Sequence, residues 1–145
     1  MSPRFLWHFN LVVCPEATRK AQRDIFSTIV GWFLTDFPAS KVGGTTGVGA
    51  VAGRLVDAMV SLHESVSKTL RPSASRMHYL FSMHDIFRVL RGILLHSQAV
   101  VDRPSDLLRL WAHETRRVYE DRLSSQVGII FIKYFSLYSV NVQCE

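Results

Sequence analysis

The sequence predicts a mainly α-helical fold, a small helical bundle, and three observations support this prediction. Apolar residues recur at three- and four-residue steps in four separate segments, which is the spacing of helices with one buried face. Prolines and a capping motif stand where such helices begin or end. A chain of 145 residues that is 48% hydrophobic and 20% charged fits one domain with a modest core. We expect helices near residues 16–37, 50–70, 82–97 and 104–122.

The first two helices are bounded by prolines. Pro15 is tolerated at a first helical position, and Glu16 suits the positive end of a helix. The second helix runs from about Ala50 and ends before Pro72, because a residue that precedes proline disfavours the helical conformation. The apolar face of the first helix comprises Ile25, Phe26, Ile29, Val30, Phe33, Leu34 and Phe37.

The third and fourth helices carry clear start signals. Ser82 and Asp85 have the S-x-x-D spacing of a capping box, in which a side chain at each position satisfies a free backbone N–H group. The fourth helix begins near Pro104. Trp111 in this helix and Trp32 in the first helix stand at apolar-face spacing, so both are expected as core anchors. The apolar face of the third helix comprises Met83, Ile86, Phe87, Leu90, Ile93 and Leu94.

A Gly/Thr-rich segment, residues 41–49, separates the first two helices and invites comparison with a phosphate-binding loop. Its spacing is wrong, because Gly47 is not followed by the lysine and hydroxyl residue of G-x-x-x-x-G-K-[ST]. No apolar strand precedes the segment, as a dinucleotide-binding fold would require. The sequence also has no apolar strand ending in Asp-Glu, the acidic strand that binds magnesium in such ATPases. We interpret the segment as a flexible linker. The chain alone is expected to lack ATPase activity, catalytic residues and a cofactor.

Composition excludes several other classes of function. The net charge is +5 and the pI is near 9.6, but basic residues are scattered, so nucleic-acid binding is unsupported. The two cysteines and six histidines show no metal-ligand spacing. No secretory signal is present, which favours a reducing cytoplasmic compartment. Residues 127–140 form an apolar tail that favours strand, but it is too short and too polar to span a membrane.

Three blocks of this sequence resemble one family. Residues 78–92, HYLFSMHDIFRVLRG, resemble H-Y-L-F-N-L-R-D-x-S-R-V-x-Q-G, a pattern of the third AAA+ module of axonemal dynein heavy chains. Residues 3–10, PRFLWHFN, resemble P-R-F-x-R-H-F-N, which closes the large subdomain of that module. Residues 110–123, LWAHETRRVYEDRL, resemble L-W-x-H-E-x-x-R-V-x-x-D-R-L, a late helix of the lid subdomain. The blocks occur in the family's order, and the resemblance covers about residues 2–123.

The resemblance implies a fragment of a motor protein. Residues 1–14 would end the AAA+ large subdomain, residues 15–123 would form the helical lid, and residues 124–145 would be a non-homologous tail. Such a fragment would relay nucleotide state around an ATP-driven ring without itself being catalytic. Its partners would be neighbouring AAA+ modules and, through the parent protein, intermediate chains, light chains and microtubules of a ciliary or flagellar axoneme. ATP and magnesium would bind the intact parent module. The alternative is a stand-alone basic helical protein-interaction module.

The resemblance also implies three residues close to nucleotide. Arg4 matches an arginine near the module boundary that reaches a neighbouring nucleotide, although Trp7 replaces the second arginine of that pattern. His84 stands where the family has the arginine that senses the γ-phosphate, and Arg88 matches the other arginine of the helix. The alternatives are a solvated Arg4 and structural roles for His84 and Arg88, with Arg88 paired to an acid within the lid. We interpret His113-Glu114 as a lone pair on a surface-like helix, where it contributes to helix-end electrostatics.

Overall fold

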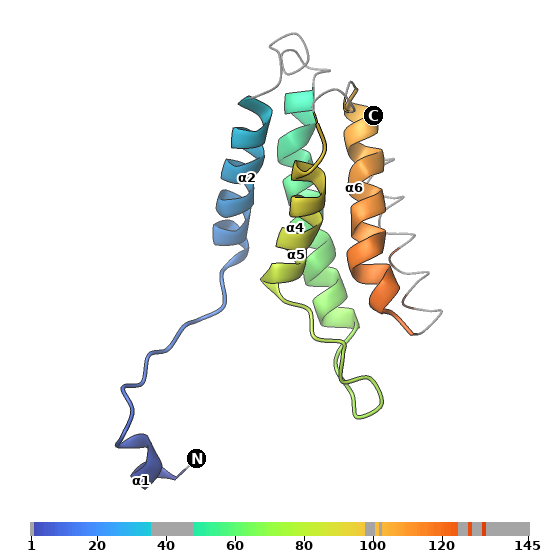
Figure 1. Cartoon of the computed structure of the whole chain (residues 1–145). Helices are drawn as coiled ribbons and strands as arrows, with labels where there is room; N and C mark the ends of the chain where they lie inside the picture. The colour runs from blue at the N-terminus through green and yellow to red at the C-terminus, as the bar shows by residue number, and fades with distance from the viewer. Residues whose placement is uncertain are drawn as a thin grey trace.

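A computed structural model of the chain describes residues 2–35, 48–97, 101, 103–124, 128 and 132. The prediction of a mainly helical bundle is confirmed (Figure 1), and the described residues contain no strand beyond a single bridge between Ser73 and Arg76. The elements are α1 (Pro3–Leu6), α2 (Arg19–Thr35), α4 (Val48–Thr69), α5 (Met83–Leu94), α6 (Pro104–Tyr119) and the 3-10 turn η1 (Glu120–Arg122).

The helix boundaries agree with the predicted ones to within three residues wherever both lie among the described residues, and the start of α2 shows what sets one of them. This helix begins at Arg19 rather than near residue 16, because Thr18 caps it. The N–H of Ala21 donates a hydrogen bond to the Thr18 hydroxyl at 3.3 Å, and the N–H of Gln22 donates to the Thr18 carbonyl at 2.9 Å. A threonine side chain that accepts such a bond defines the N-terminus of a helix. Pro15 therefore precedes the helix.

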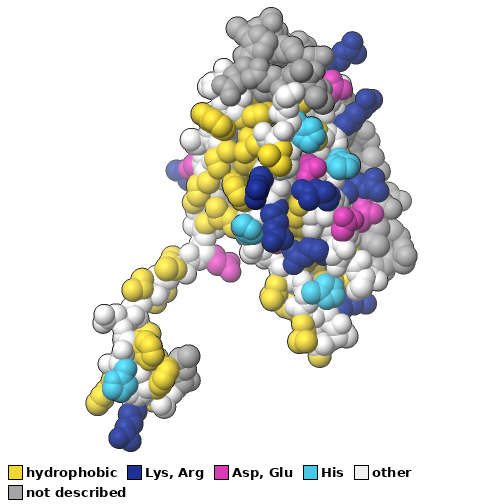
Figure 2. Space-filling view, in the orientation of Figure 1, with side chains coloured by type: hydrophobic (Ala, Val, Ile, Leu, Met, Phe, Trp, Pro, Cys, Tyr) yellow, Lys and Arg dark blue, Asp and Glu magenta, His cyan; other side chains and the backbone are white. Residues whose placement is uncertain are grey.

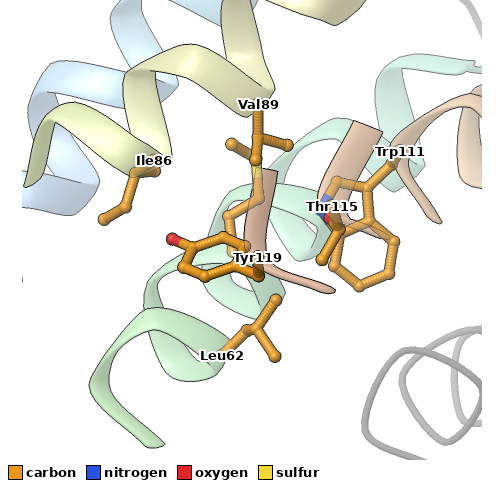
Figure 3. A pocket seen from close by; sticks show the side chains of 7 residues that line it. Leu62, Ile86, Val89, Trp111, Thr115 and Tyr119 are labelled. Carbon is orange, nitrogen blue, oxygen red and sulfur yellow. The ribbon is translucent and has the colours of Figure 1, made fainter. Parts of the chain in front are cut away.

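The core lies where α4, α5 and α6 meet. Helix α2 packs against α4, α5 packs against α6, and α4 contacts both α5 and α6, so the four helices lie side by side (Figure 1). Figure 3 shows side chains of all three helices converging at this meeting point, and the space among them is too small for a water molecule. They are Met59, Leu62, Ile86, Val89, Trp111, Thr115 and Tyr119.

Of the two tryptophans predicted as core anchors, only one is buried, so the prediction for the other is wrong. Trp111 is buried, with 1% of its surface exposed, but Trp32 is 64% exposed. The buried face of α2 is set by Phe26, Val30 and Phe33. A helix has 3.6 residues per turn, so Trp32 falls on the side away from this face. Trp32 therefore does not contribute to the core.

The N-terminal residues lie outside the bundle. Helix α1 stands apart from the other helices, and residues 10–18 connect it to α2 without helix or strand (Figure 1). None of the side chains in α1 is buried. This short helix was not among the predicted elements. The exposed large apolar side chains of this part of the chain are Phe5, Trp7, Phe9, Leu11, Val12 and Val13.

Two predicted features fall largely outside the described residues. In the Gly/Thr-rich segment, residues 41–47 lie outside the described residues, and the last two residues, 48 and 49, belong to α4. In the apolar tail only Gly128 and Ile132 are described, and both are helical where strand was expected. Among the helices that the structure describes, none is long and apolar enough to cross a membrane.

Candidate functional site

The segment between α4 and α5 forms an aromatic strap, residues His78–Phe81, that crosses to the end of α6. Tyr79 is buried, and its hydroxyl accepts a hydrogen bond from the N–H of Ser124 at 3.2 Å. Phe81 stacks on Tyr119, with ring centroids 5.9 Å apart and planes inclined by 28°. Stacked aromatic pairs at such distances add to the apolar burial of the rings. The aromatic strap is therefore fixed to the C-terminal part of the bundle.

Arg122 in η1 joins the aromatic strap to the start of α5. Its Nη1 donates to Oδ1 of Asp85 at 2.8 Å. Its Nη2 donates to the carbonyl oxygens of His78 at 3.2 Å and Leu80 at 2.8 Å. The guanidinium also lies 5.1 Å from the ring centroid of Phe81, within cation–π range. One planar side chain with several donors thus binds both the aromatic strap and the start of α5.

Asp85 is the buried acid at this junction. Its Oδ2 accepts a hydrogen bond from the N–H of Ser82 at 2.9 Å, as the predicted capping box requires. Only 4% of the residue is exposed, so its charge depends on its partners for compensation. Arg88 lies 3.8 Å from the same carboxylate, which agrees with the expectation that Arg88 pairs with an acid of its own domain. We name the group of Asp85, Arg122 and the aromatic strap the strap junction.

A second contact joins α5 to α6 further along both helices. Glu114 of α6 is buried against Gly92 of α5, where an added Cβ would overlap the glutamate side chain. Nε and Nη2 of Arg117 donate to Oε2 of Glu114 at 2.9 Å and 2.6 Å. Burial raises the pKa of Glu114, but hydrogen bonds from Arg117 and His113 outweigh it, so the pKa of this carboxyl is below its usual value.

The interpretation of Glu114 as part of a surface pair is therefore wrong. His113 is exposed and its Nδ1 lies 3.2 Å from Oε1 of Glu114, but the glutamate itself points between the helices. The reason lies on the other helix, since Gly92 leaves room that no other residue type would leave. The sequence held a signal for this contact. Gly92 is the last residue of the block 78–92, and Glu114 lies within the block 110–123, so both residues match the family pattern.

The three residues expected near nucleotide are not brought together. His84 lies exposed on the first turn of α5, with its ring centroid 6.1 Å from that of Phe87. Arg88 lies one turn further along. Arg4 is in α1, which stands apart from α5 (Figure 1). The described residues also contain no group of three or more His, Cys, Asp or Glu that could hold a metal ion.

A buried histidine links α4 to α6. Nδ1 of His63 lies 3.1 Å from the hydroxyl of Tyr119. Burial lowers the pKa of His63, although the charges of Asp85 and Glu16 act in the opposite direction. Burial, with the charge of Asp85, raises the pKa of Tyr119, so its hydroxyl stays protonated and can donate to the neutral imidazole. The pair is therefore neutral in the folded protein at neutral pH.

The free energy of unfolding should fall as the pH drops below 6.5, the ordinary pKa of histidine. The pKa of His63 is lower in the folded protein, so the unfolded residue takes up more protons in this range and protonation favours unfolding. Urea denaturation between about pH 7.5 and pH 5.5 measures this slope without titrating most carboxyls. His63→Gln, which keeps a side-chain amide near Tyr119, should give a shallower slope. Equal slopes for both proteins would contradict the assignment.

Comparison with known proteins identifies the family. Residues 55–136, more than half of the chain, match the AAA+ lid domain family. The chain belongs to this family, and the helical bundle agrees with that assignment.

The relatives are axonemal dyneins. The chain is 31% identical over 123 residues to human dynein axonemal heavy chain 6, 32% identical over 131 residues to human dynein axonemal heavy chain 1, and 32% identical over 123 residues to mouse dynein axonemal heavy chain 17. These alignments cover 85%, 87% and 85% of this chain, and the chain spans about 3% of the length of each relative. The predicted resemblance to the lid region of a dynein heavy chain is confirmed.

Proposed function

We propose that this chain is the lid region of the third AAA+ module of an axonemal dynein heavy chain. Residues 1–14 would close the large subdomain, residues 15–123 would form the lid and residues 124–145 would follow it. The observation that supports this proposal is the way the motif blocks meet. Asp85 and Gly92 of one block contact Arg122 and Glu114 of the other, so residues that carry the resemblance hold the bundle together.

These contacts suit a lid that relays a signal and does no chemistry itself. The strap junction and the Gly92–Glu114 contact fix α5 to α6, so a displacement at the exposed start of α5 would be carried to η1. ATP and magnesium would be held by elements of the parent module, with Arg4, His84 and Arg88 as the residues of this chain near them. The partners would be neighbouring AAA+ modules and, through the parent protein, other dynein chains and microtubules of the axoneme.

The size of the natural protein tests this proposal. An antibody raised against residues 48–97 should detect a polypeptide many times larger than 16.5 kDa in isolated axonemes. Full-length transcripts should encode G-x-x-x-x-G-K-[ST] and an acidic strand upstream and in frame. A protein of only 16.5 kDa outside the axoneme, with no such upstream sequence, would contradict the proposal and favour a stand-alone interaction module.

His84→Arg should tighten ATP binding about tenfold in a dynein motor that carries this lid, because a charge-assisted hydrogen bond contributes about 1.5–3 kcal/mol. Arginine carries a permanent positive charge and a planar set of donors that suits phosphate oxygens. Calorimetric titration with ATP measures the change. His113→Arg on α6 adds the same charge at another exposed histidine and serves as the control. Equal ATP affinities for His84 and its arginine variant would mean that this position does not face nucleotide.

A further inference from the structure

A groove of about 460 Å³ lies between α5 and α6, and arginines dominate its lining. Arg88 and Arg91 come from α5, Arg117 comes from α6, and Arg122 comes from η1. Among the described residues that line it, none is acidic. Figure 2 shows Lys and Arg side chains gathered over this part of the bundle, with fewer Asp, Glu and His side chains among them and exposed hydrophobic atoms beside them. Such a concentration of one sign of charge attracts an anionic partner.

The four arginines do not contribute equally. Arg117 and Arg122 are engaged by the buried carboxylates of Glu114 and Asp85, which hold both side chains in place as walls of the groove. Arg88 approaches Asp85 only to 3.8 Å, and its side chain is 56% exposed. No ion pair of the Arg91 side chain occurs within the part of the chain that the structure describes. Arg88 and Arg91 are therefore the two guanidinium groups of the groove that no close ion pair within the described residues holds in place.

The spacing of Arg88 and Arg91 along α5 allows both side chains to contact the same ligand. They stand three positions apart on α5, so they project from neighbouring turns on one side of the helix. A guanidinium group binds a carboxylate through two parallel hydrogen bonds. Two carboxylates on a short acidic segment could therefore be held at once.

The rest of the groove is apolar, which bears on the kind of anion that fits. Gly92 and Val118 also line the groove, and Leu95 at the end of α5 is 76% exposed. A phosphate or nucleotide phosphate would leave this apolar surface uncovered. A peptide that carries an apolar side chain between acidic residues would cover it and meet the arginines at the same time.

We propose that this groove binds an acidic segment of a partner protein, in which carboxylates flank an apolar side chain. The carboxylates accept hydrogen bonds from Arg88 and Arg91, and the apolar side chain packs on Leu95 and Val118. The groove belongs to this chain whether or not the chain forms part of a motor ring, so its test does not depend on the proposed function.

Fluorescence anisotropy with the full chain tests the proposal at low salt. The probe is a labelled, end-blocked peptide of sequence Glu-Leu-Glu-Glu-Leu-Glu, and its counterpart has glutamine in place of every glutamate. The glutamate peptide should bind, and the glutamine peptide should bind at least about tenfold more weakly, as expected for the loss of charge-assisted hydrogen bonds. Unlabelled glutamate peptide should displace the probe at lower concentration than ATP or pyrophosphate.

Matched variants separate the groove from the net charge of the protein. Arg88→Gln with Arg91→Gln should weaken binding of the glutamate peptide at least about tenfold. The control is Arg19→Gln with Arg23→Gln on α2, which removes the same charge from side chains that are 62% and 57% exposed and should change the affinity less than about twofold. Circular dichroism checks that both variants stay folded.

Several results would overturn the proposal. Equal weakening by the two double variants would show that the peptide responds only to net charge. Stronger competition by ATP or pyrophosphate than by the peptide would indicate a site for small anions. Absence of binding, or equal binding of the glutamate and glutamine peptides to the unaltered chain, would mean that the groove does not bind acidic segments. If the Arg88 and Arg91 double variant does not fold, Arg91→Gln alone, compared with Arg23→Gln alone as its control, decides the question in the same way.

Discussion

Replacing Arg122 with methionine should lower the free energy of unfolding by about 2–4 kcal/mol, because the change leaves the buried carboxylate of Asp85 without its main partner. Methionine keeps much of the apolar contact with Phe81 while it removes every donor. The loss should be below the upper end for a buried pair, since 29% of the Arg122 side chain is exposed. Urea denaturation monitored by circular dichroism measures the change.

Arg116→Met provides the control for this prediction. Arg116 lies on the exposed side of α6 and pairs with Glu120 at 2.8 Å. An exposed pair contributes about 0–1 kcal/mol, so this variant should lose little stability. A combined Asp85→Asn and Arg122→Met variant should lose less than the sum of the two single changes, because each residue compensates the other. Additive losses would mean that Arg122 stabilises the fold through the carbonyl groups of the aromatic strap and not through Asp85.

Features set by neighbouring residues could be predicted from the sequence. Ser82 and Asp85 are three positions apart, and their capping interaction predicts the start of α5 almost to the residue. Proline defines the start of α6 at Pro104 in the same way. Trp32 was assigned wrongly because α2 also carries apolar residues, such as Ile25, on the side away from Phe26 and Val30, and only packing against α4 decides which side is buried.

Features set by distant residues could not be predicted from spacing. Asp85 and Arg122 are 37 positions apart, and nothing local to either residue indicates that they pair. Glu114 beside His113 has the sequence of a surface pair, and its burial follows from a glycine on another helix. The groove between α5 and α6 likewise requires arginines from two helices and a turn. These contacts depend on how α5 and α6 are placed relative to each other. The family pattern implies that placement, whereas apolar periodicity predicts only the individual helices.

Gly92→Ala should lower the free energy of unfolding by about 1–2 kcal/mol, although alanine is the better helix former. Alanine gains about 1 kcal/mol over glycine in a helix interior. At Gly92, however, the added methyl group would overlap Cγ, Cδ and Oε2 of Glu114, so more than the flexible end of that side chain must move. Glu114 is buried and bound to Arg117, and inserting a methyl group into such packing costs about 1–3 kcal/mol or more.

Two further variants show whether the contact with Glu114 is the cause. Gly53→Ala in α4 meets no atom within 4 Å, so it should raise the free energy of unfolding by about 0.5–1 kcal/mol through helix propensity alone. Glu114→Ala removes the obstructing side chain, so Gly92→Ala should no longer destabilise when it is made in that background. Thermal and urea denaturation of the four variants and the unaltered protein measure both effects. If Gly92→Ala is as stabilising as Gly53→Ala, then α5 and α6 do not approach each other through Gly92, and the second link between the two motif blocks does not exist.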